Sequence, residues 1–524
     1  MPISSHLSAG EIQACYVEAE KARNAGSIET AQALVERILA QDPDRPGALY
    51  LRGLLALDSE QLELAQSWLE RAIAVLAHAD FYTTLCLVQI RLNALPGAMH
   101  TARLGLALRP DSSTLRYYEA VTLSAQGLID EAAVSYNKLL ELEPDHARAH
   151  ANAGVLAKNL GSLEEAERHL RRAIALAPEF LSARAHLGSV LLATGRYEEA
   201  WPWCEDRWVN FMTADGRPAP NSRPQIPLPQ WKGERPDLLT RAERASARGP
   251  RLLVIPEQGH GDSLQFVRYL PLALERFSQI GYVCPPSLRR LYEDSLCSRW
   301  PGRILLDTEL IAANEWDWYC PMMSLPMAFD TRLDTIPATM PYLYADPARA
   351  AAWRARLAAL PNPDLPRIGV VWAGGHSGMS EDKVRSLRSA QIAPLLALPH
   401  IRWISLQKTD DPAKLPDATC QASLTDWMEQ MDDFADTAAL IENLDLVISV
   451  DTSVAHLAAA MGKPVWLLNR FAGCWRWLRD RDDSPWYPTV RLFTQLRQGD
   501  WDEVLTRVAA ALQQQFAPRD ERTG

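Results

Sequence analysis

Three classes of residue recur at a spacing of 34 positions in the N-terminal part of the chain. They are the glycines Gly127, Gly161 and Gly195, the prolines Pro110, Pro144 and Pro178, and the alanines Ala132, Ala166 and Ala200. Small residues let two antiparallel helices approach closely, and a proline stops a helix in the turn before the next unit. A generic Ala/Leu-rich bundle would not give three residue classes one common period. The sequence therefore predicts stacked helix pairs that form a solenoid.

A period of 34 residues is that of tetratricopeptide repeats. Extending the frame backwards predicts repeats at 12–44, 45–78, 79–112, 113–146 and 147–180, and a last one from 181. The third repeat is irregular by about a residue. Such a solenoid offers a concave surface that usually binds a peptide or protein and carries no chemistry of its own. Its histidines are accordingly predicted to be surface or packing residues: His146, His150, His169 and His186.

Composition excludes several classes of protein. The formal charge of −11 over 524 residues argues against a nucleic-acid surface, because phosphate contacts need an excess of Lys and Arg. No uncharged apolar run is long enough for a transmembrane helix, and residues 1–20 lack the features of a signal peptide. The eight cysteines are scattered without a C-x-x-C motif, which favours free thiols. These patterns together predict a cytoplasmic protein.

The rest of the chain predicts two α/β lobes. After a repeat domain at 12–210, residues 211–250 are rich in Pro and Arg, which predicts a linker and a clean cut near residue 225. Apolar runs that read as buried strands occupy 251–256, 281–284, 303–306, 366–375, 401–407, 444–450 and 464–468. Helical patterns between them predict parallel sheets covered on both faces, in lobes at 251–350 and 365–516. Ligands of such sheets bind beyond the carboxyl ends of the strands.

The first candidate site is a glycine loop, EQGHGDSL (257–264), between the strand at 251–256 and a helical pattern. Gly259 and Gly261 allow backbone N–H groups to face a ligand at a helix start, although Leu264 breaks the dinucleotide-binding pattern. Asp262 is either a helix cap or a general base that accepts a proton from a hydroxyl. His260 is the second candidate for that base.

The second candidate site follows the strand at 444–450. Asp451 stands where a helix N-cap belongs, and Thr452 and Ser453 bring hydroxyls and N–H groups to the first turn. This arrangement predicts an anion site that the helix dipole strengthens. His456 should lie on the same helix face one turn on. The alternative is a simple capped helix with a surface histidine.

The cations that face this anion site are expected in the loop after the strand at 366–375. Lys383, Arg385 and Ser386 could hold a diphosphate while a leaving group gains charge, or they could belong to a solvated charged loop. Gln407, at the end of the strand at 401–407, is a possible nucleotide contact. No residues have zinc-like ligand spacing, so no metal site is predicted.

Several of these motifs resemble a family of bacterial glycosyltransferases that carry tetratricopeptide repeats and are related to the lipopolysaccharide heptosyltransferases. The resemblance is carried by EQGHGDSLQFVRYL (257–270), by 433–468 and by WRWLRDRDDSPWYPTVRLF (475–493), and it extends over about 225–515 plus the repeats. It implies a GT-B fold of two Rossmann-like lobes and an inverting transfer from a nucleotide sugar without a catalytic metal.

The resemblance also implies roles for particular residues. Asp262 matches the family's general base, Asp451, Thr452 and Ser453 match the donor-binding helix start, and a basic donor residue falls near Lys383 or Arg385. The loop GGHSGMSEDKVRS (374–386) departs from the family's asparagine-rich version. The domain plan is also similar to that of protein O-GlcNAc transferase and of flagellin glycosyltransferases, whose catalytic histidine motif is not matched here.

The sequence as a whole thus predicts a tetratricopeptide α-solenoid followed by a two-lobed GT-B enzyme. The expected reaction moves a sugar from a nucleotide sugar, which is a co-substrate rather than a cofactor, to a Ser or Thr hydroxyl of a protein recruited by the repeats. One rival is an enzyme that glycosylates lipopolysaccharide or polysaccharide. The other rival is a catalytically inactive repeat scaffold.

Overall fold

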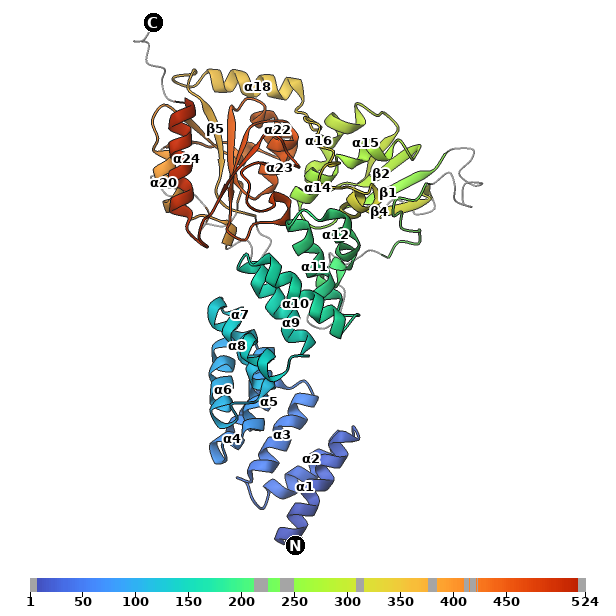
Figure 1. Ribbon diagram of the computed structural model, residues 1–524, viewed down its shortest axis with the longest axis vertical. Coiled ribbons are helices and arrows are strands. Elements are labelled where there is room, and N and C mark those ends of the chain that lie inside the picture. Colours follow the sequence, from blue (N-terminus) through green and yellow to red (C-terminus); the bar gives the residue numbers. More distant parts are fainter. Residues whose placement is uncertain are drawn as a thin grey trace. The chain divides into compact units, whose positions relative to one another are not determined.

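The computed structural model describes residues 7–211 (side chains to 208), 225–235, 249–307, 315–375, 384–409, 414, 421 and 423–516. The chain forms two compact units, Met1–Ala183 and Arg184–Gly524. Both can be followed along the coloured ribbon of Figure 1. No helix in the described part is long and apolar enough to cross a membrane.

Unit 1 is a series of antiparallel helix pairs, as the 34-residue period predicts. The helices are α1 (Ala9–Asn24), α2 (Ile28–Leu39), α3 (Pro46–Asp58), α4 (Leu62–Val75), α5 (Ala79–Arg91), α6 (Leu95–Leu108), α7 (Ser113–Ala125), α8 (Ile129–Leu142), α9 (Ala147–Asn159) and α10 (Leu163–Leu176). The first pair begins at Ala9, three residues before the predicted frame. Ala132 and Ala166 are fully buried where the paired helices meet, which confirms the role predicted for the recurring alanines.

The turn inside each pair needs a residue with positive φ. Gly127 and Gly161 take φ values of 77° and 80°, which glycine adopts without steric cost. Glu60 and Asn93 take this conformation in the second and third pairs. Asn93 lies 33 residues after Glu60, one fewer than the period of 34. The irregularity predicted for the third repeat is therefore the loss of one residue.

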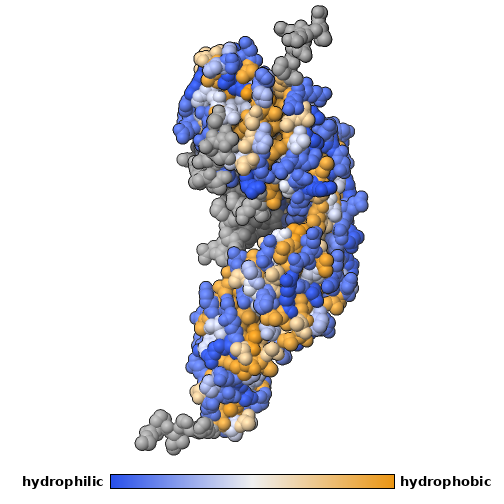
Figure 2. Space-filling view, turned by 90° about the vertical axis from the view of Figure 1, so that its left-hand side faces the viewer, coloured by the Kyte–Doolittle hydropathy of each residue, from blue (hydrophilic) through white to orange (hydrophobic). Residues whose placement is uncertain are grey.

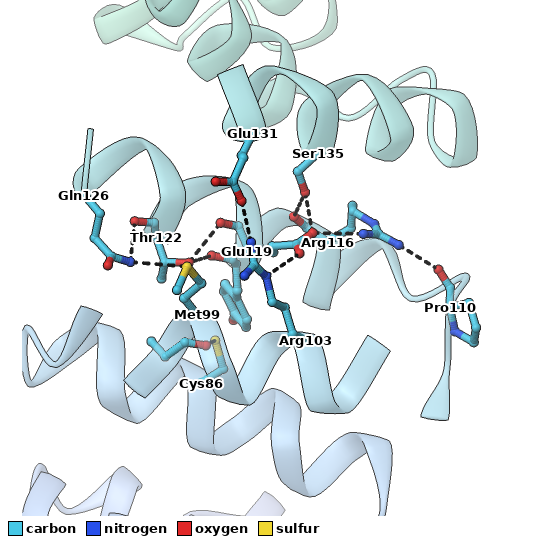
Figure 3. A network of polar contacts seen from close by, with 12 residues as sticks. Cys86, Met99, Arg103, Pro110, Arg116, Glu119, Thr122, Gln126, Glu131 and Ser135 are labelled. Atoms are coloured by element: carbon cyan, nitrogen blue, oxygen red, sulfur yellow. Dashed lines mark hydrogen bonds and ion pairs between the residues drawn. The ribbon is translucent and has the colours of Figure 1, made fainter. Parts of the chain in front are cut away.

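A polar network adds to the apolar packing between two neighbouring repeats (Figure 3). The carboxylate of Glu119, on α7, accepts hydrogen bonds from Arg116 at 2.9 Å and from Ser135 of α8 at 2.7 Å. Arg103 of α6 lies 3.5 Å from the other carboxylate oxygen. Elsewhere on the repeats, hydrophobic residues are spread among hydrophilic ones on the face seen in Figure 2. Leu108 and Leu142, one period apart, are among the exposed leucines.

Unit 2 begins inside α11 (Leu181–Ala193), which is followed by α12 (Tyr197–Cys204) and the 3-10 helix η1 (Glu205–Phe211). The boundary of the unit therefore falls at the start of the last helix pair, whereas the sequence predicts a repeat domain that ends at 210. Tyr197 and Trp201 of α12 are buried in unit 2, and this burial groups the helix with the lobes.

The first lobe contains a four-stranded parallel sheet in the order β3-β2-β1-β4. Its strands are β1 (Arg251–Ile255), β2 (Gln279–Val283), β3 (Ile304–Asp307) and β4 (Trp318–Pro321). The helix α14 (His260–Phe266) follows β1, and the short helix α17 (Leu325–Ala328) comes soon after β4. The predicted strands are present, and β4 is an addition. In the predicted linker, Trp231 is buried and its backbone N–H donates to the carbonyl of Tyr319 on β4 at 2.8 Å.

The second lobe contains a six-stranded parallel sheet in the order β10-β9-β8-β5-β6-β7. The strands are β5 (Arg367–Val371), β6 (Arg402–Ser405), β7 (Leu424–Thr425), β8 (Leu446–Val450), β9 (Val465–Asn469) and β10 (Val490–Thr494). Helices α18 (Pro347–Ala358), α20 (Ser389–Leu396), α22 (Phe434–Ile441), α23 (Ser453–Ala460) and α24 (Trp501–Phe516) complete it. The chain thus consists of helical repeats followed by two lobes with parallel sheets, which confirms the predicted fold class.

Candidate functional site

The strand orders decide where each sheet can hold a ligand. In the second sheet the chain leaves β5 toward β6 on one side and returns to β8 on the other, so the order switches between β5 and β8. In the first sheet it switches in the same way between β1 and β4. Open parallel sheets bind ligands beyond the carboxyl ends of the strands at such a switch. The segments after β1, β5 and β8 are therefore the candidate site, and they contain the motifs singled out in the sequence.

Asp262 lies in the first turn of α14, where it supports the glycine loop. One oxygen of its carboxylate accepts a hydrogen bond from the backbone N–H of Gly259 at 2.9 Å. The other oxygen forms an ion pair with Arg476. The N-cap of α14 is therefore Gly259, and Asp262 caps the helix start from the third helical position rather than as the N-cap itself. Each carboxylate oxygen has a second lone pair, so this capping does not exclude proton acceptance.

Arg476 is a site residue that the motif analysis did not single out. It lies in the 3-10 helix η9 (Trp475–Trp477) within the loop between β9 and β10, and it is 8% exposed. Its Nε also donates a hydrogen bond to the side chain of Gln265 on α14. Burial acts to lower the pKa of Arg476, but Asp262 raises it above the ordinary value, so the guanidinium stays charged. The only sequence signal was its position inside the segment 475–493 that carries the family resemblance.

His260 has different neighbours from Asp262, two residues further on. Its Nε2 is 2.9 Å from the hydroxyl of Ser287, and its ring packs against Phe434 at 5.4 Å between centroids. Residues two apart on a helix do not share a face. The ion pair with Arg476 thus belongs to Asp262 alone, and His260 remains the second candidate for a base.

A buried ion pair between Glu257 and Arg207 fixes the loop before α14. Glu257 accepts two hydrogen bonds from the guanidinium of Arg207, on η1, both at 2.7 Å. It also accepts one from the backbone N–H of Met323 at 2.9 Å. A buried carboxylate needs this pairing because its desolvation is costly. Nothing near Glu257 in the sequence predicts a partner 50 residues upstream.

The helix start after β8 differs in one detail from the prediction. The N-cap of α23 is Thr452 rather than Asp451, and no side chain caps the first-turn N–H groups. The hydroxyl of Thr452 is instead paired with that of Ser449 at 2.9 Å. The first N–H groups of an α-helix have no partner within the helix. Those of α23, beginning at Ser453, are thus available to an anion.

Asp451 comes just before this cap and is ionised. Its carboxylate lies 3.7 Å from Nε2 of His456. Burial acts to raise the pKa of Asp451, but His456 and Arg476 lower it to about 2. His456 itself is 4% exposed, hydrogen-bonded through Nδ1 to the hydroxyl of Tyr487 at 2.8 Å, and stacked on Trp477. The surface position considered for His456 is therefore wrong.

The segment after β5 brings a cation to the same edge. Nη1 of Arg385 donates to the backbone carbonyl of Asp451 at 2.8 Å, and the hydroxyl of Ser386 accepts from the N–H of Gly374 at 3.0 Å. Gln407 is 6% exposed, and its amide oxygen accepts from the backbone N–H groups of Trp372 and Ala373. This places Gln407 beneath the loop as a support. Lys383 lies outside the described residues.

The two lobes meet through their helix starts. An added Cβ at Gly261 of α14 would lie 2.9 Å from a ring carbon of His456 and 3.7 Å from Cα of Ser453, both on α23. Farther along, Arg290 joins Asp433 and Asp436 of α22 in ion pairs at 2.5 and 2.7 Å. Asp433 and Asp436 thus link the lobes. The glycine loop and the start of α23 thus lie side by side.

Comparisons with known proteins agree with this architecture. Residues 424–468, which include β8 and the start of α23, match the model of glycosyltransferase family 9 (heptosyltransferase). Residues 16–79, 117–179 and 152–206 match the tetratricopeptide repeat model. Protein FlbA of Caulobacter vibrioides is 28% identical over 307 residues, which are 55% of this chain and 48% of FlbA. The chain therefore spans about half the length of this curated relative.

Solved structures with similar folds include repeat proteins. YrrB, described as a TPR protein with an unusual peptide-binding site, is 25% identical with a TM-score of 0.30 over 32% of this chain and 88% of that chain. TTC0263, a thermophilic TPR protein in Thermus thermophilus, is 22% identical with a TM-score of 0.28 over 34% of this chain and 99% of that chain. The matches in sequence, together with the fold, show tetratricopeptide repeats followed by two α/β lobes, the second of which matches the glycosyltransferase family 9 model at residues 424–468.

Proposed function

We propose that this chain is an inverting, metal-independent glycosyltransferase that moves a sugar from a nucleotide sugar to a Ser or Thr hydroxyl of a protein recruited by the repeats. The observation that carries the proposal is the close packing of α14 on α23 at Gly261. It brings a carboxylate that could accept a proton and a helix start that could bind phosphate to the facing edges of two lobes. The family match includes the second of these elements.

The residues divide the reaction between the lobes. The acceptor hydroxyl oxygen attacks the anomeric carbon, and the bond from that carbon to the phosphate oxygen breaks with its electron pair. Asp262 accepts the hydroxyl proton. The first-turn N–H groups of α23 and the guanidinium of Arg385 stabilise the charge that develops on the departing diphosphate. These groups supply positive potential without a metal ion.

The donor site can be tested by calorimetry with UDP, GDP, ADP and CMP in EDTA. We expect one of them to bind with a dissociation constant in the range of about 1 μM to 1 mM that is typical of enzyme substrates. Arg385→Gln should weaken this binding by about 10- to 150-fold, because a hydrogen bond from a charged group contributes roughly 1.5–3 kcal/mol. Arg388→Gln, three residues on, is the matched control. Binding of none of the four, or only with added metal, would refute the proposed donor site.

The base is tested with Asp262→Asn, which keeps an acceptor oxygen for the N–H of Gly259 but cannot take a proton. We expect turnover of the donor, followed as released nucleotide, to fall by about 10²–10⁴-fold while nucleotide affinity is retained. A stability change alone would instead indicate a cap. If the variant turns over at the wild-type rate, the assignment is wrong and His260→Gln is the next variant to measure.

A further inference from the structure

The carboxylate of Asp262 is held in one orientation by groups from two lobes. Gly259 of the first lobe contacts one oxygen and Arg476 of the second lobe contacts the other. Arg476 is in turn fixed to α14 by its hydrogen bond to Gln265 and donates to the sulfur of Cys474 at 3.1 Å. The orientation of the Asp262 carboxylate therefore depends on the position of the loop that carries Arg476.

That loop is clamped by an aromatic cluster, which we define as Tyr197, Trp201, Phe266, Trp475 and Trp486. The guanidinium of Arg476 lies over the ring of Trp475 at 4.6 Å and over that of Phe266 at 5.7 Å. Trp475 in turn meets Trp201 at 6.0 Å, Trp486 at 6.0 Å and Tyr197 at 6.2 Å between centroids. Phe266 is on α14, the helix that carries Asp262.

Two members of the aromatic cluster come from α12, the last helix of the repeat region. The hydroxyl of Tyr197 accepts a hydrogen bond from the indole of Trp486 at 2.9 Å. The indole of Trp201 donates to the backbone carbonyl of Thr331 in the first lobe at 2.7 Å. Both side chains are nearly inaccessible. The helix α12 therefore contacts both the loop that carries Arg476, through Trp486, and the first lobe, through Thr331.

We propose that Arg476 is a positioning residue that fixes the carboxylate of Asp262, and that α12 holds Arg476 in place through Tyr197 and Trp201. The last repeat helix is then part of the catalytic structure and not only of the array. This inference rests on the proposed function for its catalytic consequence, because it assigns Asp262 the role of base. Its structural part rests on the aromatic cluster alone.

The role of Arg476 is tested in the full chain with Arg476→Gln and Arg476→Lys. We expect Arg476→Gln to lower kcat for donor turnover by about 10²-fold, as a misplaced catalytic group does, with KM for the donor within about threefold of wild type. Arg476→Lys keeps the charge but not the fork that reaches Asp262 and Gln265 together, so it should restore part of kcat. Unchanged kcat in Arg476→Gln overturns the positioning role.

The role of α12 is tested by amide hydrogen exchange, which can be measured whether or not the protein is active. Trp201→Phe should increase amide hydrogen exchange in 259–266 and 474–487, and lower kcat in the same direction as Arg476→Gln. Trp353→Phe is the control, since Trp353 on α18 packs against Trp427, with 5.2 Å between ring centroids, outside the aromatic cluster. Unchanged exchange in these segments overturns the role of α12. A wild-type protein that binds and turns over no donor refutes the proposed function instead, and the exchange result still decides the clamp.

Discussion

At Gly261 the two lobes pack closely, and this position has no room for a side chain. Its neighbour across the contact, His456, cannot swing away freely because Tyr487 binds its ring and Trp477 stacks on it. The backbone of Gly261 is not in a left-handed conformation. The glycine is therefore required by space and not by backbone strain.

Gly261→Ala should accordingly destabilise the lobes. A Cβ placed 2.9 Å from the ring of His456 forces α14 or the ring to move, and overpacking of this kind costs about 1–3 kcal/mol. Urea unfolding followed by tryptophan fluorescence measures the loss, and nucleotide affinity should fall as α23 shifts. Gly375→Ala is the control, because none of the residues that the structure describes lies within 4 Å of its added Cβ. Equal stability of the two variants would contradict the close approach.

At the scale of elements, buried polar side chains recur with the 34-residue period at the contact between the two helices of a repeat. Arg116 and Ser135, linked through Glu119, occupy the positions that His150 and His169 occupy one repeat later (116 + 34 and 135 + 34). The two histidines lie on α9 and α10 and share a hydrogen bond of 2.9 Å between their Nδ1 atoms. Burial lowers the pKa of His169 to about 4, with Arg168 and His150 adding to the effect.

The α9–α10 pair should therefore loosen in acid. Unfolded histidine titrates near pH 6.5, so between about pH 6.5 and 4 the unfolded state binds a proton that the folded state excludes, and stability falls as pH falls. The loss approaches about 3 kcal/mol, since each pKa unit corresponds to about 1.4 kcal/mol. Hydrogen exchange of α9 and α10 amides, corrected for intrinsic rates, should rise across this range. His169→Gln should flatten the dependence, whereas the exposed His100→Gln should not.

The elements could be predicted where their signal is local. Three residue classes on one period marked the repeats, and apolar runs marked strands such as β5, β8 and β9. The strand β4 was missed because its four residues, WYCP, follow two acidic residues and end in proline, which weakens a strand pattern. The cap of α23 was placed one residue early, which is an ordinary error at a helix end.

At the scale of the whole chain, the site depends on contacts that no local pattern contains. Arg476 is 214 residues from Asp262, and Tyr197 is 289 residues from Trp486. Sequence motifs predicted Asp262, Asp451 and Arg385 because each stands in a local strand–turn–helix pattern. The partners that orient them come from other elements, so the motifs could indicate the site but not its supports.

The same contacts decide where the chain can be cut. A fragment that begins at 225, the cut that composition suggests, loses Arg207 and leaves the carboxylate of Glu257 buried without its partner. Breaking such a pair costs about 3–5 kcal/mol, and the aromatic cluster loses Tyr197 and Trp201 as well. We expect 225–524 to be unstable and 181–524 to bind nucleotide like the full chain, in calorimetry and thermal unfolding. Full-chain affinity and stability in 225–524 would show that these contacts are dispensable.

The fragment 181–524 also tests the acceptor. If the repeats of unit 1 recruit a protein, this fragment should turn over the donor at the full-chain rate while modification of the acceptor, identified by glycoproteomics of a deletion strain, is lost. Undiminished modification would favour lipopolysaccharide or polysaccharide as the acceptor.

The unit boundary between Ala183 and Arg184 separates a repeat array whose length can change from a set of residues that must be conserved together. Upstream of it, duplication or loss of a whole 34-residue repeat would lengthen or shorten the array and leave the side chains around Asp262 untouched. Downstream of it, Tyr197 and Trp201 form one inherited set with Trp475 and Trp486, although 289 residues separate the first from the last. Among descendants of such a chain, repeat number should drift freely, while these four positions change together or not at all.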